Sequence, residues 1–263
     1  MNSDAGIREL RRRAKLRLLR MHYESNVGHI GGNLSVLDIM LTLHHQVLRA
    51  DVDEFILSKG HAAGAWYVTL WSLGLLSEED LVRFHKDGTR LAGHPPARGI
   101  PAVSFATGSL GHGLSLAAGL ALAKRVKSES GRVFCVTSDG EWNEGSTWEA
   151  LIFVAHQRLR NLVVFVDVNG LQGFGTTREV ANLEPLAAKL ETFDIVVREI
   201  DGHDPDAISE AVREDGSAGR PIFILAKTCK GCGVSFLEHR MDSHYLPMNE
   251  AQYRQAVDDV TRS

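Results

Sequence analysis

The second half of the chain alternates short apolar runs with amphipathic segments, and this alternation constrains the fold most. Apolar runs separated by helices are what a parallel sheet buried on both faces requires. The expected strands are 132–138, 162–168, 193–200 and 222–227, and the expected helices between and beside them are 146–158, 183–191 and 205–213. The pattern therefore predicts an α/β fold.

The first half of the chain reads mainly as helix. The spacing predicts helices over 35–48, 61–74 and 114–127, with an irregular stretch at 86–107 that Pro95, Pro96 and Pro101 interrupt. The first twenty residues are basic, but acidic residues interrupt the charge and no leader-type cleavage site follows, so we expect a helix that belongs to the fold. We predict one three-layer domain over 1–263, with a mainly parallel sheet and a helical N-terminal lead-in.

Composition excludes several classes of protein. The 263 residues hold 29 Lys and Arg against 33 Asp and Glu, a net charge of −4, so no basic field marks a nucleic-acid binder. No apolar run approaches the ~20 residues that span a bilayer. Three cysteines are too few for a disulfide framework, so we expect a cytoplasmic protein.

Two oxygen-bearing side chains follow two successive strands of the predicted sheet. Asp139 follows the first strand and Asn169 follows the next, 30 positions later. A strand–helix–strand unit takes about 30 residues and its strands are parallel, so both side chains would lie at the carboxyl edge of the sheet. Each dipeptide alone, Asp-Gly or Asn-Gly, is also typical of an ordinary turn. As a pair, a carboxylate and an amide oxygen suit Mg²⁺ or Ca²⁺ rather than zinc.

Residues 138–172 resemble the thiamine-diphosphate motif, with Ser138 in place of its leading glycine. Resemblance to the transketolase family extends through six motifs in the family's order: GHIGG (28–32), SKGHAAG (58–64), AGHP (92–95), TGSLGHGLS (107–115), DGEWNEG (139–145) and AKTCKGCG (226–233). A substrate-binding serine of the family is replaced here by Gly32. Together the motifs cover nearly the whole chain.

The resemblance implies a set of site residues. The metal would be held by Asp139, Asn169 and the carbonyl of Leu171. The residues that would contact thiamine diphosphate are His61, Gly108, Ser109, Leu110, Gly140, Glu144, Asn169, Lys230 and His244. His29, His61 and His94 would be the catalytic histidines, and imidazole is the side chain suited to proton transfer near neutral pH.

Three features have competing interpretations. The TGSLGHG segment would offer backbone N–H groups at a helix N-terminus, a good anion site, with His112 structural rather than catalytic. Glu144 fits either a helix cap or an interface glutamate. Cys229-x-x-Cys232 invites a zinc or redox interpretation, but no second ligand pair has matching spacing and the pair follows a strand in a glycine loop, so a structural role is favoured.

The implied activity is a transfer of a two-carbon ketol unit from a ketose (phosphate) donor to an aldehyde or aldose acceptor. In the family, the glutamate that activates the cofactor lies on a pyrimidine-binding domain, and residues 245–263 are too few to form one. The resemblance therefore implies the N-terminal subunit of a split transketolase, in an α₂β₂ heterotetramer with a partner chain, with Trp142 and Trp148 as interface anchors. A two-chain enzyme that passes a C2 unit to a nonsugar or carrier-protein acceptor, similar to the α chain of an E1 enzyme, and a non-catalytic chain remain as alternatives.

Overall fold

A five-stranded parallel sheet forms the centre of the computed structural model, which describes residues 4–213 and 219–262. The strands are β1 (Glu54–Leu57), β2 (Val133–Ser138), β3 (Leu162–Val168), β4 (Val196–Asp201) and β5 (Ile222–Lys227). They lie side by side in the order β1-β2-β3-β5-β4, and every pairing is parallel. The predicted α/β class with a mainly parallel sheet is confirmed.

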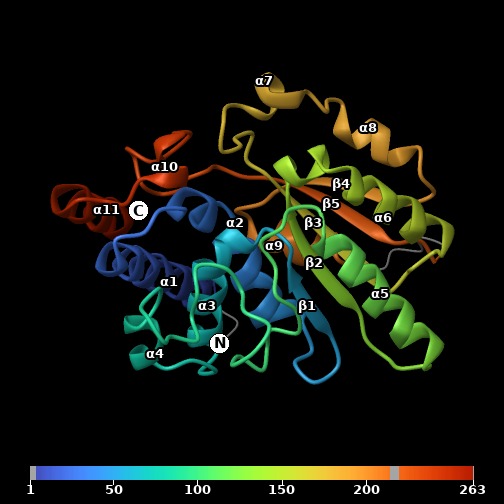
Figure 1. Cartoon of the computed structure of the whole chain (residues 1–263), viewed down its shortest axis with the longest axis horizontal. Coiled ribbons are helices and arrows are strands. Elements are labelled where there is room, and N and C mark those ends of the chain that lie inside the picture. The colour runs from blue at the N-terminus through green and yellow to red at the C-terminus, as the bar shows by residue number, and fades with distance from the viewer. Residues whose placement is uncertain (1–3, 214–218, 263) are drawn as a thin grey trace.

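Helices cover both faces of this sheet (Figure 1). On one face lie α2 (Ile30–Thr42), α3 (Ala63–Ser72) and α9 (Pro205–Ala211), with α1 (Asp4–Ser25) packed outside α2 and α3, and on the other lie α5 (Gly113–Val126), α6 (Gly145–His156) and α8 (Leu186–Glu191). Successive strand residues divide between the two cores: in β2, Phe134 and Val136 face the first, whereas Val133 and Cys135 face the second. Because side chains of a strand alternate between faces, burial on both sides gives the continuous apolar runs of the sequence.

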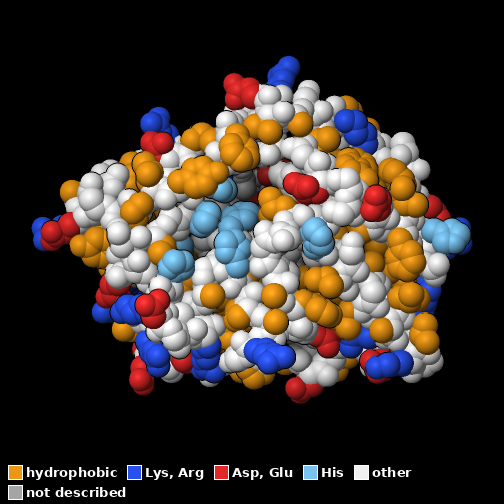
Figure 2. Space-filling view, in the orientation of Figure 1, with side chains coloured by type: hydrophobic (Ala, Val, Ile, Leu, Met, Phe, Trp, Pro, Cys, Tyr) orange, Lys and Arg blue, Asp and Glu red, His pale blue; other side chains and the backbone are white. Residues whose placement is uncertain are grey.

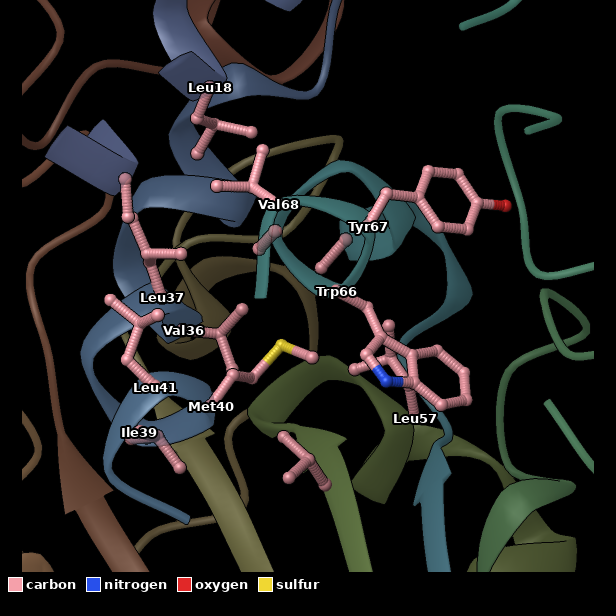
Figure 3. Close-up of a cluster of buried hydrophobic side chains, with 14 of the residues drawn as sticks. Leu18, Val36, Leu37, Ile39, Met40, Leu41, Leu57, Trp66, Tyr67 and Val68 are labelled. Carbon is pink, nitrogen blue, oxygen red and sulfur yellow. The ribbon is translucent and has the colours of Figure 1, made fainter. Parts of the chain in front are cut away.

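The larger core centres on α2 and α3 (Figure 3). Every residue of α2 is buried, including Gly31 and Gly32. Side chains of α1, α2, α3 and β1 meet there: Leu18, Val36, Leu37, Ile39, Met40, Leu41, Leu57, Trp66, Tyr67 and Val68. A helix that is apolar all round must be covered on all sides, so α2 lies between the sheet and the outer helix α1.

The remaining elements are short, apart from the C-terminal helix. They are η1 (Leu43–Val47), η2 (Gly60–Ala62), α4 (Glu78–Val82), η3 (Asp139–Asn143), α7 (Thr177–Ala181), α10 (Asp242–Tyr245) and α11 (Glu250–Arg262). The segment 86–107 holds no regular element, as expected. None of the described helices is long and apolar enough to cross a membrane.

The structure corrects three predicted elements. The helix expected over 35–48 begins earlier, at Ile30, and ends at Thr42, after which the chain makes a π-helical turn. The strand expected over 193–200 is β4, which starts at Val196 because 192–195 form the turn after α8. Strand β1 was not expected, because its apolar run is only the three residues after Glu54.

Candidate cofactor site

The carboxyl ends of β2 and β3 bring the two predicted metal ligands together. Asp139 opens η3 directly after β2, and Asn169 follows β3, in the strand pair where Ser138 lies opposite Asp167. The Gly170 N–H, next to Asn169, donates to Asp139 Oδ2 at 2.7 Å. The predicted juxtaposition at this edge of the sheet is therefore confirmed.

Asp139 is a buried carboxylate with little to compensate its charge. Its exposed fraction is 7%, and backbone N–H groups of Gly140 and Gly170 donate to its two oxygens. Burial, together with the charge of Asp167, raises the pKa of Asp139 to about 7. Among the described residues, no cationic side chain forms an ion pair with it. A carboxylate left in this state is a site to which a cation would bind favourably.

Asp167, one β-ladder position from Asp139, has the opposite environment. Lys59 Nζ forms a fully buried ion pair with its Oδ2, and Ser35 Oγ donates to the same oxygen at 2.6 Å. Burial alone would raise the pKa of Asp167, but the charge of Lys59 holds it below its usual value. Asn169 Nδ2 also donates to Asp167 Oδ2, at 3.3 Å. The Asn169 Oδ1 accepts from the Leu171 N–H at 3.1 Å, so the two bonds together fix the orientation of the amide.

Four histidines gather on the far side of the same cleft. The ring centroid of His29 lies 5.8 Å from that of His61, 6.1 Å from that of His94 and 5.1 Å from that of His244. His29 precedes α2 with φ of 65°, a left-handed conformation held by its N–H, which donates to the carbonyl of His244. Gly108 has φ of +142°, and a Cβ there would lie 2.8 Å from the ring of His94. The glycines next to these histidines therefore permit close contact between loops.

All four rings are neutral at pH 7. Burial lowers the pKa of each, and neighbouring positive charge adds to this effect: for His61 that charge is Lys59, and for His244 it is Lys230. The pKa of His61 lies well below its usual value, and that of His244 is about 3. Neutral imidazoles both donate and accept hydrogen bonds, which suits them to hydroxyl groups and to proton transfer.

Lys230 supplies positive charge between the metal ligands and the histidines. Its Nζ donates to Leu171 O at 3.2 Å and to His244 Nδ1 at 3.0 Å. Burial and the charge of Lys59 lower the pKa of Lys230 to about 8. The Lys230 ammonium therefore stays charged at neutral pH at the base of the cleft that also holds the Asp139 carboxylate.

These groups line one cleft of about 490 Å³. Figure 2 shows histidine side chains gathered beside this hollow, with hydrophobic side chains along its rim. The lining contains every candidate site residue except Ser109, which is exposed and lies outside it. The candidates that line it are His29, His61, His94, Gly108, Leu110, Asp139, Gly140, Glu144, Asn169, Leu171, Lys230 and His244.

A side chain occupies part of the TGSLGHG segment, where the sequence predicts an anion site. Glu141 Oε1 accepts from the Gly111 N–H at 3.0 Å and from Ser58 Oγ, and its Oε2 accepts from the Ser138 N–H at 2.9 Å. Ser58 Oγ in turn accepts from the Gly113 N–H, at the start of α5, at 3.1 Å. Burial raises the pKa of Glu141. This carboxylate therefore joins three loops of the cleft, and an anion site at the other N–H groups of the segment stays a prediction.

Two further expectations are corrected at this edge. The Glu144 side chain is exposed and forms no cap bond with α6, so the capping interpretation is wrong, while the interface interpretation stays open. Trp142 is fully buried, with its ring 5.2 Å from that of Trp148, so it cannot anchor a partner. His112 is exposed and outside the cleft, its Nδ1 bonded to Leu110 O at 3.1 Å.

Sequence reasoning missed the residues beneath the cleft. Lys59 and Asp167 each interrupt a buried run, FILSKGHAA and LVVFVDV, and a charge inside such a run is a signal of a buried pair. The other overlooked lining residues carried no motif signal: Gln172, Gly173, Phe174, Val180, Ala181 and Tyr245.

A buried carboxylate, an amide and a lysine thus lie together at the carboxyl edge of a parallel sheet, the edge where α/β domains bind their ligands. Comparison with known proteins narrows the class of α/β domain. Residues 12–260 match the model of the transketolase thiamine diphosphate binding domain. The chain belongs to the transketolase family.

Two curated relatives are named as subunits of split enzymes. The chain is 36% identical to SqwG, a 6-deoxy-6-sulfo-D-fructose transketolase subunit of Clostridium sp. (strain MSTE9), over 90% of this chain and 89% of that protein. It is also 36% identical to one of the apulose-4-phosphate transketolase subunits of Actinobacillus succinogenes, over 83% of this chain and 82% of that one.

Solved transketolases share the fold. The enzyme of Campylobacter jejuni superposes with a TM-score of 0.88 at 27% identity, which covers 99% of this chain and 43% of that one. Human transketolase is 32% identical over 89% of this chain and 38% of its own length. The chain thus spans less than half of the single-chain transketolases but most of the split subunits.

Proposed function

We propose that this chain is the N-terminal subunit of a thiamine-diphosphate-dependent transketolase that transfers a two-carbon ketol unit between sugars. The observation that carries the proposal is the joint placement, in one cleft of a transketolase-family domain, of three neutral histidines and a buried carboxylate that no described cationic side chain pairs with. When bound, thiamine diphosphate supplies the carbanion chemistry.

The residues of this chain would bind and orient the diphosphate and move protons. Asp139, Asn169 Oδ1 and Leu171 O would hold Mg²⁺, and these oxygen donors fit a hard cation. The set fits the structure because Asp139 lacks a positive partner among the described residues. Lys230, which already donates to Leu171 O, would add charge beside the diphosphate.

His29, His61 and His94 would act on the substrate. The ring centroids of His61 and His94 lie 5.8 and 6.1 Å from that of His29, which suits the three to the hydroxyl and carbonyl oxygens of a sugar. Gly32 lies beside His61: a Cβ there would be in van der Waals contact with the ring, at 3.4 Å, so the glycine leaves the space of a small side chain next to the ring. We propose that this space affects which substrate fits.

A second chain would complete the active site. Two residues that line the cleft are exposed, Phe174 by 86% and Tyr245 by 54% of their surfaces. Leu246, next to Tyr245 in the chain, is 59% exposed, and α6 exposes Ile152 by 56%. Apolar side chains gathered at the mouth of a cleft are typical of a surface that a partner covers. The two relatives above are named as subunits, which supports a partner that carries the pyrimidine-binding domain.

Activity assays with separated chains test this proposal. We expect the purified chain to be inactive alone and to gain ketol-transfer activity when it is mixed with a C-terminal transketolase subunit from the same genome. Light scattering on the mixture should show two copies of each chain, a closed symmetric assembly. Full activity of this chain without a partner would refute the split-enzyme proposal.

A further inference from the structure

The turn that carries Lys230 also carries two free thiols. Cys229 and Cys232 are both half-buried, and the Cys232 N–H donates to the Cys229 carbonyl at 3.1 Å. A turn closed by this bond holds its first and fourth Cα atoms less than about 7 Å apart, which overlaps the ~4.4–6.8 Å that a disulfide requires. The backbone therefore already brings the two cysteines within reach of each other.

Three other elements surround Cys232 with polar groups. Lys15 Nζ, from α1, lies 3.8 Å from its sulfur. The sulfur, a ring nitrogen of His203 and a carboxylate oxygen of Asp38 all lie within 4.8 Å of one another. His203 Nδ1 lies 2.8 Å from Asp38 Oδ2, so the imidazole is oriented by a carboxylate. An ammonium beside the sulfur, as Lys15 provides, is a surrounding that is typical of a reactive cysteine.

The charges of this cluster disfavour a metal ion. Asp38 already pairs with Arg11 at 2.7 Å and with Lys15 at 3.7 Å. The Cys229 N–H donates to His203 Nε2 at 2.9 Å, and His203 Nδ1 faces Asp38, so both ring nitrogens already have partners. The ring is thus held in place beside the thiol and has no nitrogen free for a metal ion.

We propose that Cys232 and Cys229 form a reversible dithiol–disulfide site that a hydroperoxide oxidises. The Cys232 thiolate attacks one peroxide oxygen, an S–O bond forms, the O–O bond breaks and an alcohol or water leaves with a proton. The Cys229 thiol then attacks the resulting sulfenic sulfur, an S–S bond forms and the hydroxyl leaves as water. Two electrons pass from the thiols to the peroxide, and a reducing dithiol reverses the change.

The two cysteines have different environments. Burial and the charge of Glu238 raise the pKa of the Cys229 thiol to about 11. Cys232 has instead the Lys15 ammonium and His203 beside it. Because a thiolate is the reactive form, Cys232 is the thiol that the peroxide attacks, and Cys229 is the resolving thiol. This revises the purely structural role that the sequence favoured.

The disulfide would alter the cofactor cleft through Lys230, and this consequence rests on the proposed function. Lys230 and Gly231 lie between the cysteines, and the Gly231 N–H donates to the Gly31 carbonyl of α2 at 3.0 Å. When the disulfide forms, the Cys232 sulfur moves away from Lys15, and the Cys229 sulfur moves away from His239 Nε2, which lies 3.5 Å from it in the reduced chain. The turn must adjust, so the Lys230 ammonium leaves its positions on Leu171 and His244, and diphosphate binding weakens.

Peptide mapping of the full chain tests the dithiol site without any cofactor. After treatment with a few equivalents of hydrogen peroxide, we expect a Cys229–Cys232 linkage that dithiothreitol removes. Cys135→Ala, a change at the fully buried third cysteine, should leave the linkage intact, and Cys229→Ser should stop oxidation at the Cys232 sulfenic acid. Lys15→Met, which removes the ammonium beside the Cys232 sulfur, should slow alkylation of Cys232 by iodoacetamide several-fold. No linkage, or equal alkylation rates, would overturn the proposal.

Calorimetric titration with thiamine diphosphate and Mg²⁺ tests the coupling to the cleft. We expect binding to the oxidised chain to be several-fold weaker than to the reduced chain, with recovery after reduction and no response to peroxide in Cys232→Ser. A mapped disulfide with unchanged affinity would overturn the coupling. A reduced chain that binds no cofactor even when it is assembled with its partner would instead contradict the proposed function, while the peptide map still decides the dithiol site.

Discussion

Two buried aspartates lie close together at the cleft and differ in what compensates their charge. Asp167, with Lys59, lies beneath the cleft, and we call this pair the floor; Asp139 lines the cleft, and we call it the wall. In the floor, Asp167 pairs with Lys59 and accepts from Ser35 and Asn169, all from this chain. In the wall, Asp139 accepts only from backbone N–H groups among the described residues, and its pKa is raised to about 7, whereas that of Asp167 is lowered.

The difference separates structural charge from ligand-binding charge. A buried ion that its own chain neutralises fixes the positions of neighbouring groups, as Asp167 does for the amide of Asn169. A buried ion that the chain leaves uncompensated costs stability until a ligand arrives. The wall is therefore where a cation belongs, and the floor is what holds its ligands in place.

Removal of the wall carboxylate should have the largest effect. We expect Asp139→Ala to abolish Mg²⁺-dependent binding of thiamine diphosphate, because repulsion from the diphosphate is then uncompensated. Calorimetric titration of the assembled enzyme measures it, with Glu149→Ala, an exposed carboxylate on α6, as the matched control. Unchanged affinity for thiamine diphosphate in Asp139→Ala would show that Asp139 does not bind the metal ion and so does not differ from Asp167 in this respect.

Truncation of a catalytic histidine should lower turnover and leave the binding of metal and cofactor at the carboxylate nearly unchanged. We expect His94→Ala and His29→Ala to lower kcat by about 10²–10⁴-fold, the usual contribution of a general acid or base, with cofactor affinity nearly unchanged. His156→Ala, an exposed histidine at the end of α6, is the matched control. Full rates in both variants would make these histidines structural.

Removal of Lys59, the cation of the floor, should lower the free energy of unfolding. We expect Lys59→Met to destabilise the chain by about 3–5 kcal/mol, since it leaves Asp167 buried and unpaired. Urea unfolding measures this. Lys227→Met, which breaks the exposed pair with Glu199, should cost no more than about 1 kcal/mol. Equal losses in the two variants would show that the floor pair is no more than a surface ion pair.

Most of the fold and much of the site could be predicted because they depend on local patterns. The alternation of apolar runs with amphipathic segments located four of the five strands. The spacing of a βαβ unit placed Asp139 beside Asn169. Strand β1 was missed because its apolar run is too short to distinguish from a loop.

The rest depends on contacts between distant segments. The sequence spacing says nothing of which residues lie under Asp139, since Lys59 and Asp167 are 108 positions apart. Nor does it show that Glu141 would accept from the Gly111 N–H in the loop before α5, or that Trp142 would be buried in the core. A charge inside a buried run signals a partner but does not identify it.

The smallest expected effect is a pH dependence that distinguishes the two aspartates directly. Because the pKa of Asp139 is raised to about 7, the carboxyl binds a proton below that pH, and a metal ion must displace it. The affinity for Mg²⁺ alone should fall by about tenfold for each pH unit below 7 and level off above it. The lowered pKa of Asp167 keeps that group ionised throughout this range, so it adds nothing to the change.

Calorimetry in buffers of different ionisation enthalpy measures the protons released. We expect the wild-type chain to release about one proton per Mg²⁺ bound near pH 6 and almost none near pH 8. A variant of the floor that conserves charge, Lys59→Arg, should keep this profile even where its stability is lower, because the proton comes from the wall. Proton release that is equal at the two pH values would show that Asp139 is already ionised in the metal-free chain. The contrast between floor and wall would then rest on geometry alone.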